Sequence, residues 1–179
     1  AQRLIYINGG QLTLTSGNYR GRPSLLVEGN AEVVLDHPKF GPVKQYAASV
    51  TLNGGTTLVT GNMYLESGLF SLKSGKLLLR GGQFAEIAVA SGTLEDVLCD
   101  GYTYTDYDKA FITNYDVSSL KRVKVVAHDH SFGNDSVCTS CGFICKKHRF
   151  NESGICTRCG YDTNPTTVTK DNYKELGLT

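Results

Sequence analysis

Short runs of alternating hydrophobic and polar residues fill the first half of the chain, and glycines separate them at a regular step. Glycines recur every seven residues at Gly54, Gly61, Gly68, Gly75 and Gly82. Successive side chains of a strand point to opposite faces, so each run predicts a short strand with one buried face. Glycine readily adopts the positive φ of a tight corner, so each glycine predicts a change of chain direction.

The seven-residue step favours a solenoid over hairpins. A hairpin needs adjacent strands that fold back through a loop of about two to five residues, whereas this chain turns at single glycines. Three sides make a coil of about 21 residues, stacked on the next at about 4.8 Å. We therefore expect an all-β protein in which residues 1–126 form a right-handed parallel β-solenoid of about five coils. The alternative is an antiparallel β-sandwich with glycine-rich turns, since antiparallel pairing is commoner in general.

The inward side chains of these strands would form one continuous core. The alternation assigns to it Leu12, Leu14, Val27, Val33, Leu35, Val50, Leu52, Leu58, Leu65, Phe70, Leu72, Leu77, Leu79, Ile87 and Val89. Residues 37–48 hold two of the four prolines and break the period. They predict a loop inserted between coils.

The alternation gives way to a helical run at Thr93. Ser91 or Thr93 is a suitable N-cap and Gly101 a suitable end, which predicts one short helix. Strand-like runs follow at 102–104, 110–113 and 123–126. An unpaired terminal rung invites aggregation, so we expect residues 93–126 to cap the open end of the solenoid.

Residues 93–104, Thr-Leu-Glu-Asp-Val-Leu-Cys-Asp-Gly-Tyr-Thr-Tyr, resemble a segment of large secreted surface proteins of Gram-positive, often gut-associated, bacteria. There, glycine-rich β-solenoid coils end in a similar Leu-x-x-x-Leu-x-x-Gly-Tyr segment, followed by a valine-rich strand and a Cys/His-rich stretch. The resemblance is best over residues 50–162. It implies an extracellular, multi-domain setting and no particular ligand. Cys99 stands where that family commonly has a small residue, and we interpret it as a buried small hydrophobe.

The Cys/His segment, residues 127–163, is an internal duplication. A shift of 18 residues superimposes its first half on its second. The matched pairs are His130 with His148, Phe132 with Phe150, Cys138 with Cys156, Cys141 with Cys159, Gly142 with Gly160 and Phe143 with Tyr161. Cys145 has no counterpart, since Ala127 occupies the shifted position, but His128 lies one residue further on.

Eight residues of this segment are candidate metal ligands: His128, His130, Cys138, Cys141, Cys145, His148, Cys156 and Cys159. A structural zinc ion takes four nitrogen or sulfur ligands, so the segment predicts two structural zinc sites. Because the ligands suffice to close both sites, catalytic zinc, which keeps one position open, is disfavoured.

The eight ligands can be divided in two ways. In the sequential scheme the first four in chain order hold one zinc ion and the last four hold the other. In the crossed scheme the two Cys-x-x-Cys pairs share one zinc ion, as in a ribbon. A unit that was copied whole should carry a whole site, so the duplication favours the sequential scheme.

Disulfides and redox chemistry are the alternatives to metal binding. Disulfides are common in secreted proteins, but they give no reason for three neighbouring histidines, and a Cys-x-x-Cys disulfide closes a small strained ring. A redox Cys-x-x-Cys favours a helix N-terminus in a thioredoxin-like βαβ setting, for which the sequence gives no sign.

Charge disfavours a nucleic-acid partner. Lys and Arg number 18 and Asp and Glu 17. Lys146, Lys147 and Arg149 cluster, but neither a basic helix nor an aromatic ladder accompanies them, so they are better interpreted as a solvated loop face. No apolar run approaches the roughly 20 residues that span a bilayer, so we expect no membrane insertion.

With the resemblance, which implies an extracellular bacterial setting, we expect a non-catalytic segment of an extracellular bacterial surface protein, acting as a stiff spacer or an adhesin-like display surface. Expected partners are a host glycan or a surface protein, and neighbouring domains of a longer chain. Residues 164–179 would be a linker or the start of the next segment.

Two other functions remain as alternatives. One is a carbohydrate-active β-helix enzyme, a polysaccharide lyase or hydrolase, which needs paired carboxylates on one groove. Candidate carboxylates are Glu28, Glu32, Asp36, Glu66 and Glu86, but their spacing is also that of scattered solvent-facing residues. The other is a nucleic-acid-binding zinc-ribbon protein.

Overall fold

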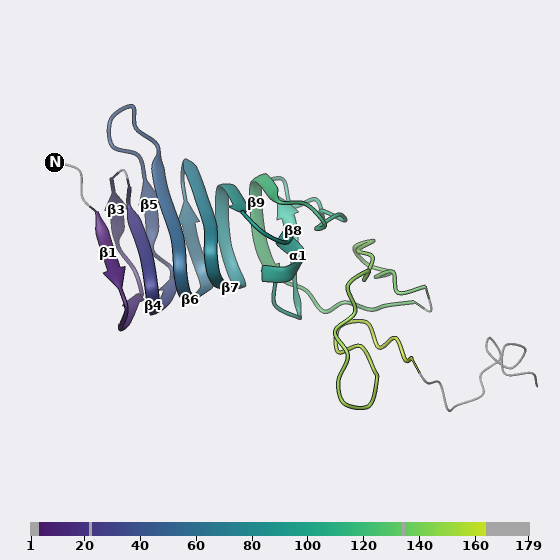
Figure 1. Cartoon of the computed structure of the whole chain (residues 1–179). Coiled ribbons are helices and arrows are strands. Elements are labelled where there is room, and N and C mark those ends of the chain that lie inside the picture. Colours follow the sequence, from purple (N-terminus) through teal and green to yellow (C-terminus); the bar gives the residue numbers. More distant parts are fainter. Residues whose placement is uncertain (1–3, 22, 134, 164–179) are drawn as a thin grey trace, which may run out of the picture. The chain divides into compact units, whose positions relative to one another are not determined.

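Strands follow one another around successive coils from Ile5 to Val89 (Figure 1). The computed structural model describes residues 4–21, 23–133 and 135–163, so the expected linker at 164–179 lies outside the described residues. The chain divides into two units, Ala1–Asp129 and His130–Thr179. The strands and the helix of the first unit are β1 (Ile5–Asn8), β2 (Gln11–Leu14), β3 (Asn18–Arg20), β4 (Leu25–Asp36), β5 (Lys39–Gly41), β6 (Ala48–Leu65), β7 (Gly68–Val89), α1 (Leu94–Val97), β8 (Tyr102–Asp106) and β9 (Ser119–Ala127).

The strands β1 to β7 form a parallel β-solenoid with three sides to each coil, as expected. The aligned residues of the three sides are Ile5–Leu25–Val50–Phe70, Gln11–Glu32–Thr56–Lys76 and Asn18–Lys39–Tyr64–Gln83. All of these pairings are parallel, which excludes the antiparallel sandwich. Each side has four rungs, one fewer than the five coils that we expected.

The loop between coils is shorter than the sequence suggested. We expected it to cover residues 37–48, but Lys39–Gly41 is strand β5 on the third side and pairs with β3 and β6. The insertion is therefore confined to residues 42–47, where Val43 and Tyr46 bond to each other's backbone. The β-propensity of Lys39–Gly41 was hidden by the prolines on both sides, at Pro38 and Pro42.

The glycines at the seven-residue step occupy the corners, with φ between 61° and 140°. Their lack of a side chain matters as much as their backbone angle. At Gly68 an added Cβ would collide with the carbonyl oxygen of Ala48 on the preceding coil. At Gly54 and Gly75 an added Cβ would likewise collide with the backbone of the preceding coil, so at these three corners the coils can stack at strand spacing only because no side chain is present.

The interior is filled as expected, with two exceptions. Leu12 is only half-buried. The prediction that Leu58 faces inward is wrong. Leu58 lies on the outer face, whereas Thr57 and Val59 are fully buried. The corner Gly54–Gly55 changes the alternation, because the register of β6 against its neighbours shifts there.

The cap differs from the expectation in its details. Helix α1 is a single turn that begins at the N-cap Thr93, whose backbone N–H donates to Asp96 Oδ2 at 2.8 Å. It ends at Leu98 and not at Gly101, because Leu98 is extended and pairs with Leu79 of the last coil. Cys99, expected to be buried, is half-buried on this edge.

Two antiparallel strands complete the cap. Strand β9 pairs with the last part of β7, and β8 pairs with β9. The strand expected at residues 110–113 is reduced to one bridge between Thr105 and Phe111. The cap has its own small core, in which the rings of Tyr104 and Tyr115 pack edge to face at 5.1 Å.

Candidate metal centre

The two halves of the Cys/His segment have the same backbone hydrogen bonds. In the first half, the N–H of Cys138 donates to Phe143 O at 2.8 Å and the N–H of Gly142 donates to Cys138 O at 2.8 Å. The second half repeats both bonds 18 residues later, from Cys156 to Tyr161 at 2.7 Å and from Gly160 to Cys156 at 2.9 Å. The glycines have φ of 73° and 74°. The duplication seen in the sequence is therefore a duplication of one local fold, a thiolate-bearing knuckle closed by a positive-φ glycine.

Threonine side chains tie each knuckle to the chain that carries its histidine. Thr139 donates to Ser131 O through both its backbone N–H, at 2.8 Å, and its hydroxyl, at 3.0 Å. Thr157 makes the same two bonds to Arg149 O, at 2.8 and 3.1 Å. These threonines were not among the residues predicted from the sequence, although their shared place after the first cysteine of each knuckle was a visible signal.

Each histidine faces the second cysteine of its knuckle. The distance from His130 Nδ1 to Cys141 Sγ is 3.5 Å, and from His148 Nδ1 to Cys159 Sγ it is 3.3 Å. Aromatic rings pack around both imidazoles: Phe132 and Phe143 around the first, and Phe150 and Tyr161 around the second. This packing fixes the orientation of the imidazole rings.

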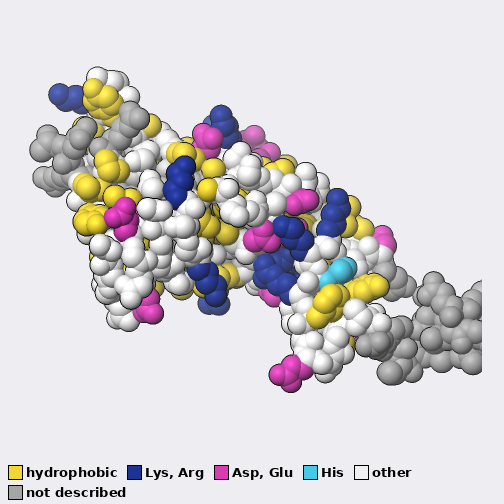
Figure 2. All heavy atoms as spheres, viewed as in Figure 1, with side chains coloured by type: hydrophobic (Ala, Val, Ile, Leu, Met, Phe, Trp, Pro, Cys, Tyr) yellow, Lys and Arg dark blue, Asp and Glu magenta, His cyan; other side chains and the backbone are white. Residues whose placement is uncertain are grey.

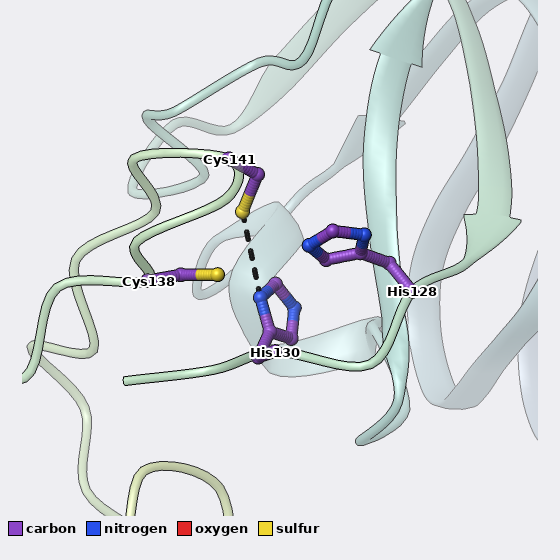
Figure 3. A group of neighbouring side chains, drawn as sticks. All are labelled: His128, His130, Cys138 and Cys141. Carbon is purple, nitrogen blue, oxygen red and sulfur yellow. Dashed lines mark hydrogen bonds between the residues drawn. The ribbon is translucent and has the colours of Figure 1, made fainter. Parts of the chain in front are cut away.

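The eight candidate ligands lie in two groups, and within each group the ligand atoms are all within 4.8 Å of one another. The first group is His128, His130, Cys138 and Cys141, and the second is Cys145, His148, Cys156 and Cys159. In Figure 3 the four side chains of the first group point toward a common centre, and His128 directly follows the end of β9. These are the groups of the sequential scheme, and the two knuckles that the crossed scheme would join belong to different groups.

The spacing in the second group matches a tetrahedral metal ion. A tetrahedron with metal–sulfur bonds of about 2.3 Å has edges of about 3.8 Å. Cys145 Sγ lies 3.9 Å from Cys156 Sγ and 3.7 Å from His148 Nδ1. The third edge given above, from His148 to Cys159, is 3.3 Å. Either group can thus hold a metal ion with four protein ligands.

The thiols of the second group ionise unequally in the metal-free protein. Burial raises the pKa of Cys145, and the neighbouring Cys159 and Cys156 raise it further. Burial also raises the pKa of Cys156, but backbone N–H groups, including that of Arg149 at 3.4 Å, more than offset it and lower the pKa to about 6. Backbone N–H groups therefore favour the thiolate form of Cys156, the form that binds a metal ion.

None of the six cysteines, all of which lie in the described residues, is joined to another by a disulfide bond. The carboxylates considered for catalysis are not paired with one another, and each is engaged by a neighbour instead. Glu28 accepts from Tyr6, Glu32 accepts from Gln11, Asp36 lies beside His37, and Glu66 and Glu86 lie beside Lys39 and Lys121.

The helix in the described residues, α1, is too short to cross a membrane.

No family model, curated protein or solved structure matches this chain.

Proposed function

We propose that this chain is a non-catalytic segment of an extracellular bacterial surface protein, in which the solenoid is a stiff spacer or display surface and the Cys/His units hold two structural zinc ions. The observation that carries the zinc sites is the gathering of eight ligand-type side chains into two groups of four. Four protein ligands close a zinc site, which is the arrangement of a structural centre.

Zinc is the metal that suits these ligands. Thiolates and imidazoles in a tetrahedral arrangement select zinc over the hard cations, which prefer oxygen ligands. Two imidazoles and two thiolates neutralise Zn²⁺ in the first group. Three thiolates and one imidazole leave one negative charge in the second, next to the cationic side chains of Lys146, Lys147 and Arg149 in the sequence.

The spacer role rests on the solenoid surface. On the face seen in Figure 2, basic and acidic side chains are interspersed and form no large field of one sign. Such a surface suits a spacer or a display surface better than a polyanion-binding protein.

The test begins with metal analysis of the purified chain. We expect two zinc ions per chain and no free reactivity of the five clustered thiols until a chelator is added. A metal content near zero, with those thiols free or oxidised, would contradict the zinc sites.

A glycan array probed with the same protein separates the two surface roles, since a display surface retains specific glycans and a spacer retains none. Incubation with polysaccharides tests the enzyme alternative. Cleavage that Glu66→Ala or Glu86→Ala abolishes would contradict the non-catalytic role.

A further inference from the structure

Cys145 belongs to the first unit of the duplication through its backbone and to the second metal group through its thiol. Its N–H donates to Ser136 O at 3.0 Å, and the preceding Ile144 forms a bridge with Val137. Its Sγ lies 3.9 Å from that of Cys156. The first knuckle therefore positions a ligand of the second group.

The second unit has the same backbone feature without the ligand. There the N–H of Thr163 donates to Gly154 O at 3.2 Å, and Asp162 bridges Ile155, both 18 residues after their counterparts. Thr163 thus occupies the place of Cys145 but has a hydroxyl instead of a thiol. The first half of the duplication therefore supplies one ligand, Cys145, to the metal group of the second half, whereas the second half has no ligand at the equivalent position.

Two side-chain contacts near Cys145 join the two halves of the Cys/His segment. The thiol of Cys159 lies 3.8 Å from the hydroxyl of Ser136, the residue whose carbonyl fixes Cys145. The guanidinium of Arg158 lies 5.7 Å from the centre of the Phe143 ring. The second knuckle therefore packs against the residues that the first knuckle orders.

We infer that the two metal sites bind cooperatively, coupled through the segment 143–145. This rests on the proposed metal binding. In a module of this size metal binding is also folding energy, so a metal ion in the first group orders the backbone that presents Cys145 to the second. Linkage requires the effect to be reciprocal, and couplings of this kind are about 5- to 150-fold in affinity.

The first experiment measures affinity at each site of the full chain. Co²⁺ or Zn²⁺ is titrated against a competing chelator into the natural protein and into two double variants, Cys138→Ser/Cys141→Ser and Cys156→Ser/Cys159→Ser. The natural protein should take up two ions cooperatively. The surviving site of each variant should bind about tenfold more weakly than the same site in the natural protein, by the same factor in both.

The second experiment separates the coupling from the ligands. Two glycines inserted between Ile144 and Cys145 keep all eight ligands but detach Cys145 from the first knuckle. This variant should still bind two ions, now independently. The matched control carries the same insertion between Asp162 and Thr163, the equivalent position without a ligand, and should stay cooperative.

The outcomes distinguish the inference from the function on which it rests. Two ions bound independently by the natural protein would overturn the coupling and leave the zinc sites standing. Unchanged cooperativity after the insertion before Cys145 would also overturn it. A chain that binds no ion would overturn both.

Discussion

Replacement of Thr57 by valine should stabilise the solenoid. Thr57 is fully buried, and its hydroxyl has no hydrogen-bond partner among the described residues. Its neighbours in the ladder are Val33 and Leu77 on the adjoining coils, both apolar. A buried hydroxyl left without a partner costs about 1–3 kcal/mol, whereas valine fills nearly the same volume with a methyl group. We therefore expect Thr57→Val to raise the free energy of unfolding by about 1 kcal/mol.

The assay is urea denaturation of the metal-saturated protein, followed by the loss of strand signal in circular dichroism. A gain of about 1 kcal/mol corresponds to a rise in Tm of roughly 2–4 °C for a chain of this size. The matched control is Thr60→Val, on the outer face of the same strand, which should change stability by less than about 0.5 kcal/mol. If Thr57→Val is less stable than the natural protein, or gains no more than the control, the buried Thr57 hydroxyl does not destabilise the fold and the prediction is wrong.

Three further changes test the corners, the exposed charges and the thiolates. Gly68→Ala should cost about 2 kcal/mol or more beyond Gly101→Ala in chemical denaturation. Both glycines have positive φ, but only at Gly68 would the new Cβ strike the backbone of the coil before it, while at Gly101 nothing lies within 4 Å; equal costs would show that backbone angle alone decides. Glu86→Ala should change the free energy of unfolding by less than about 1 kcal/mol, since the ion pair of Glu86 with Lys121 is exposed. A larger loss of stability would show that this carboxylate has a further role. Metal binding must displace protons from the ligand thiols, above all from Cys145, whose pKa is raised by burial and by the neighbouring thiols. Cys156, whose pKa is lowered to about 6, adds to this proton competition once the pH falls below about 6. A chromogenic chelator should therefore detect release of the second metal ion between pH 7 and pH 4, and full retention at pH 4 would contradict this.

The corners of the coils could be predicted from single residues, whereas the side chains that face inward depend also on how the coils stack. A positive φ at a corner is a property of one residue, so the glycine step could be converted directly into sides and coils. The inward position of Thr57 and the outward position of Leu58 depend on the adjoining coils. Leu58 is aligned with Val34 and Leu78, so an outer ladder of aliphatic side chains continues across three rungs. Hydrophobicity along the chain favours Leu58 inside, and only the register across the corner reverses that choice.

The short helix shows the same competition at the end of the solenoid. Leu98 has a high helix propensity, yet it leaves the helix for an extended conformation. The last rung presents unpaired backbone groups, and the N–H of Cys99 bonds to Leu79 O at 3.1 Å. Pairing an otherwise open sheet edge outweighs a few tenths of a kcal/mol of propensity per residue. An edge formed by residues far away in the sequence cannot be seen in a helical pattern.

The metal groups required one further step beyond the duplication. The sequential division was predicted on the premise that a unit copied whole carries a whole site, but that premise does not hold. The 18-residue unit supplies three ligands of its own, a histidine and two cysteines, and takes the fourth from the chain before it. The second unit takes Cys145 from the first, and the first takes His128 from the end of β9. The sequence already contained this difference, since Cys145 and His128 were the two ligands that the shift of 18 failed to match.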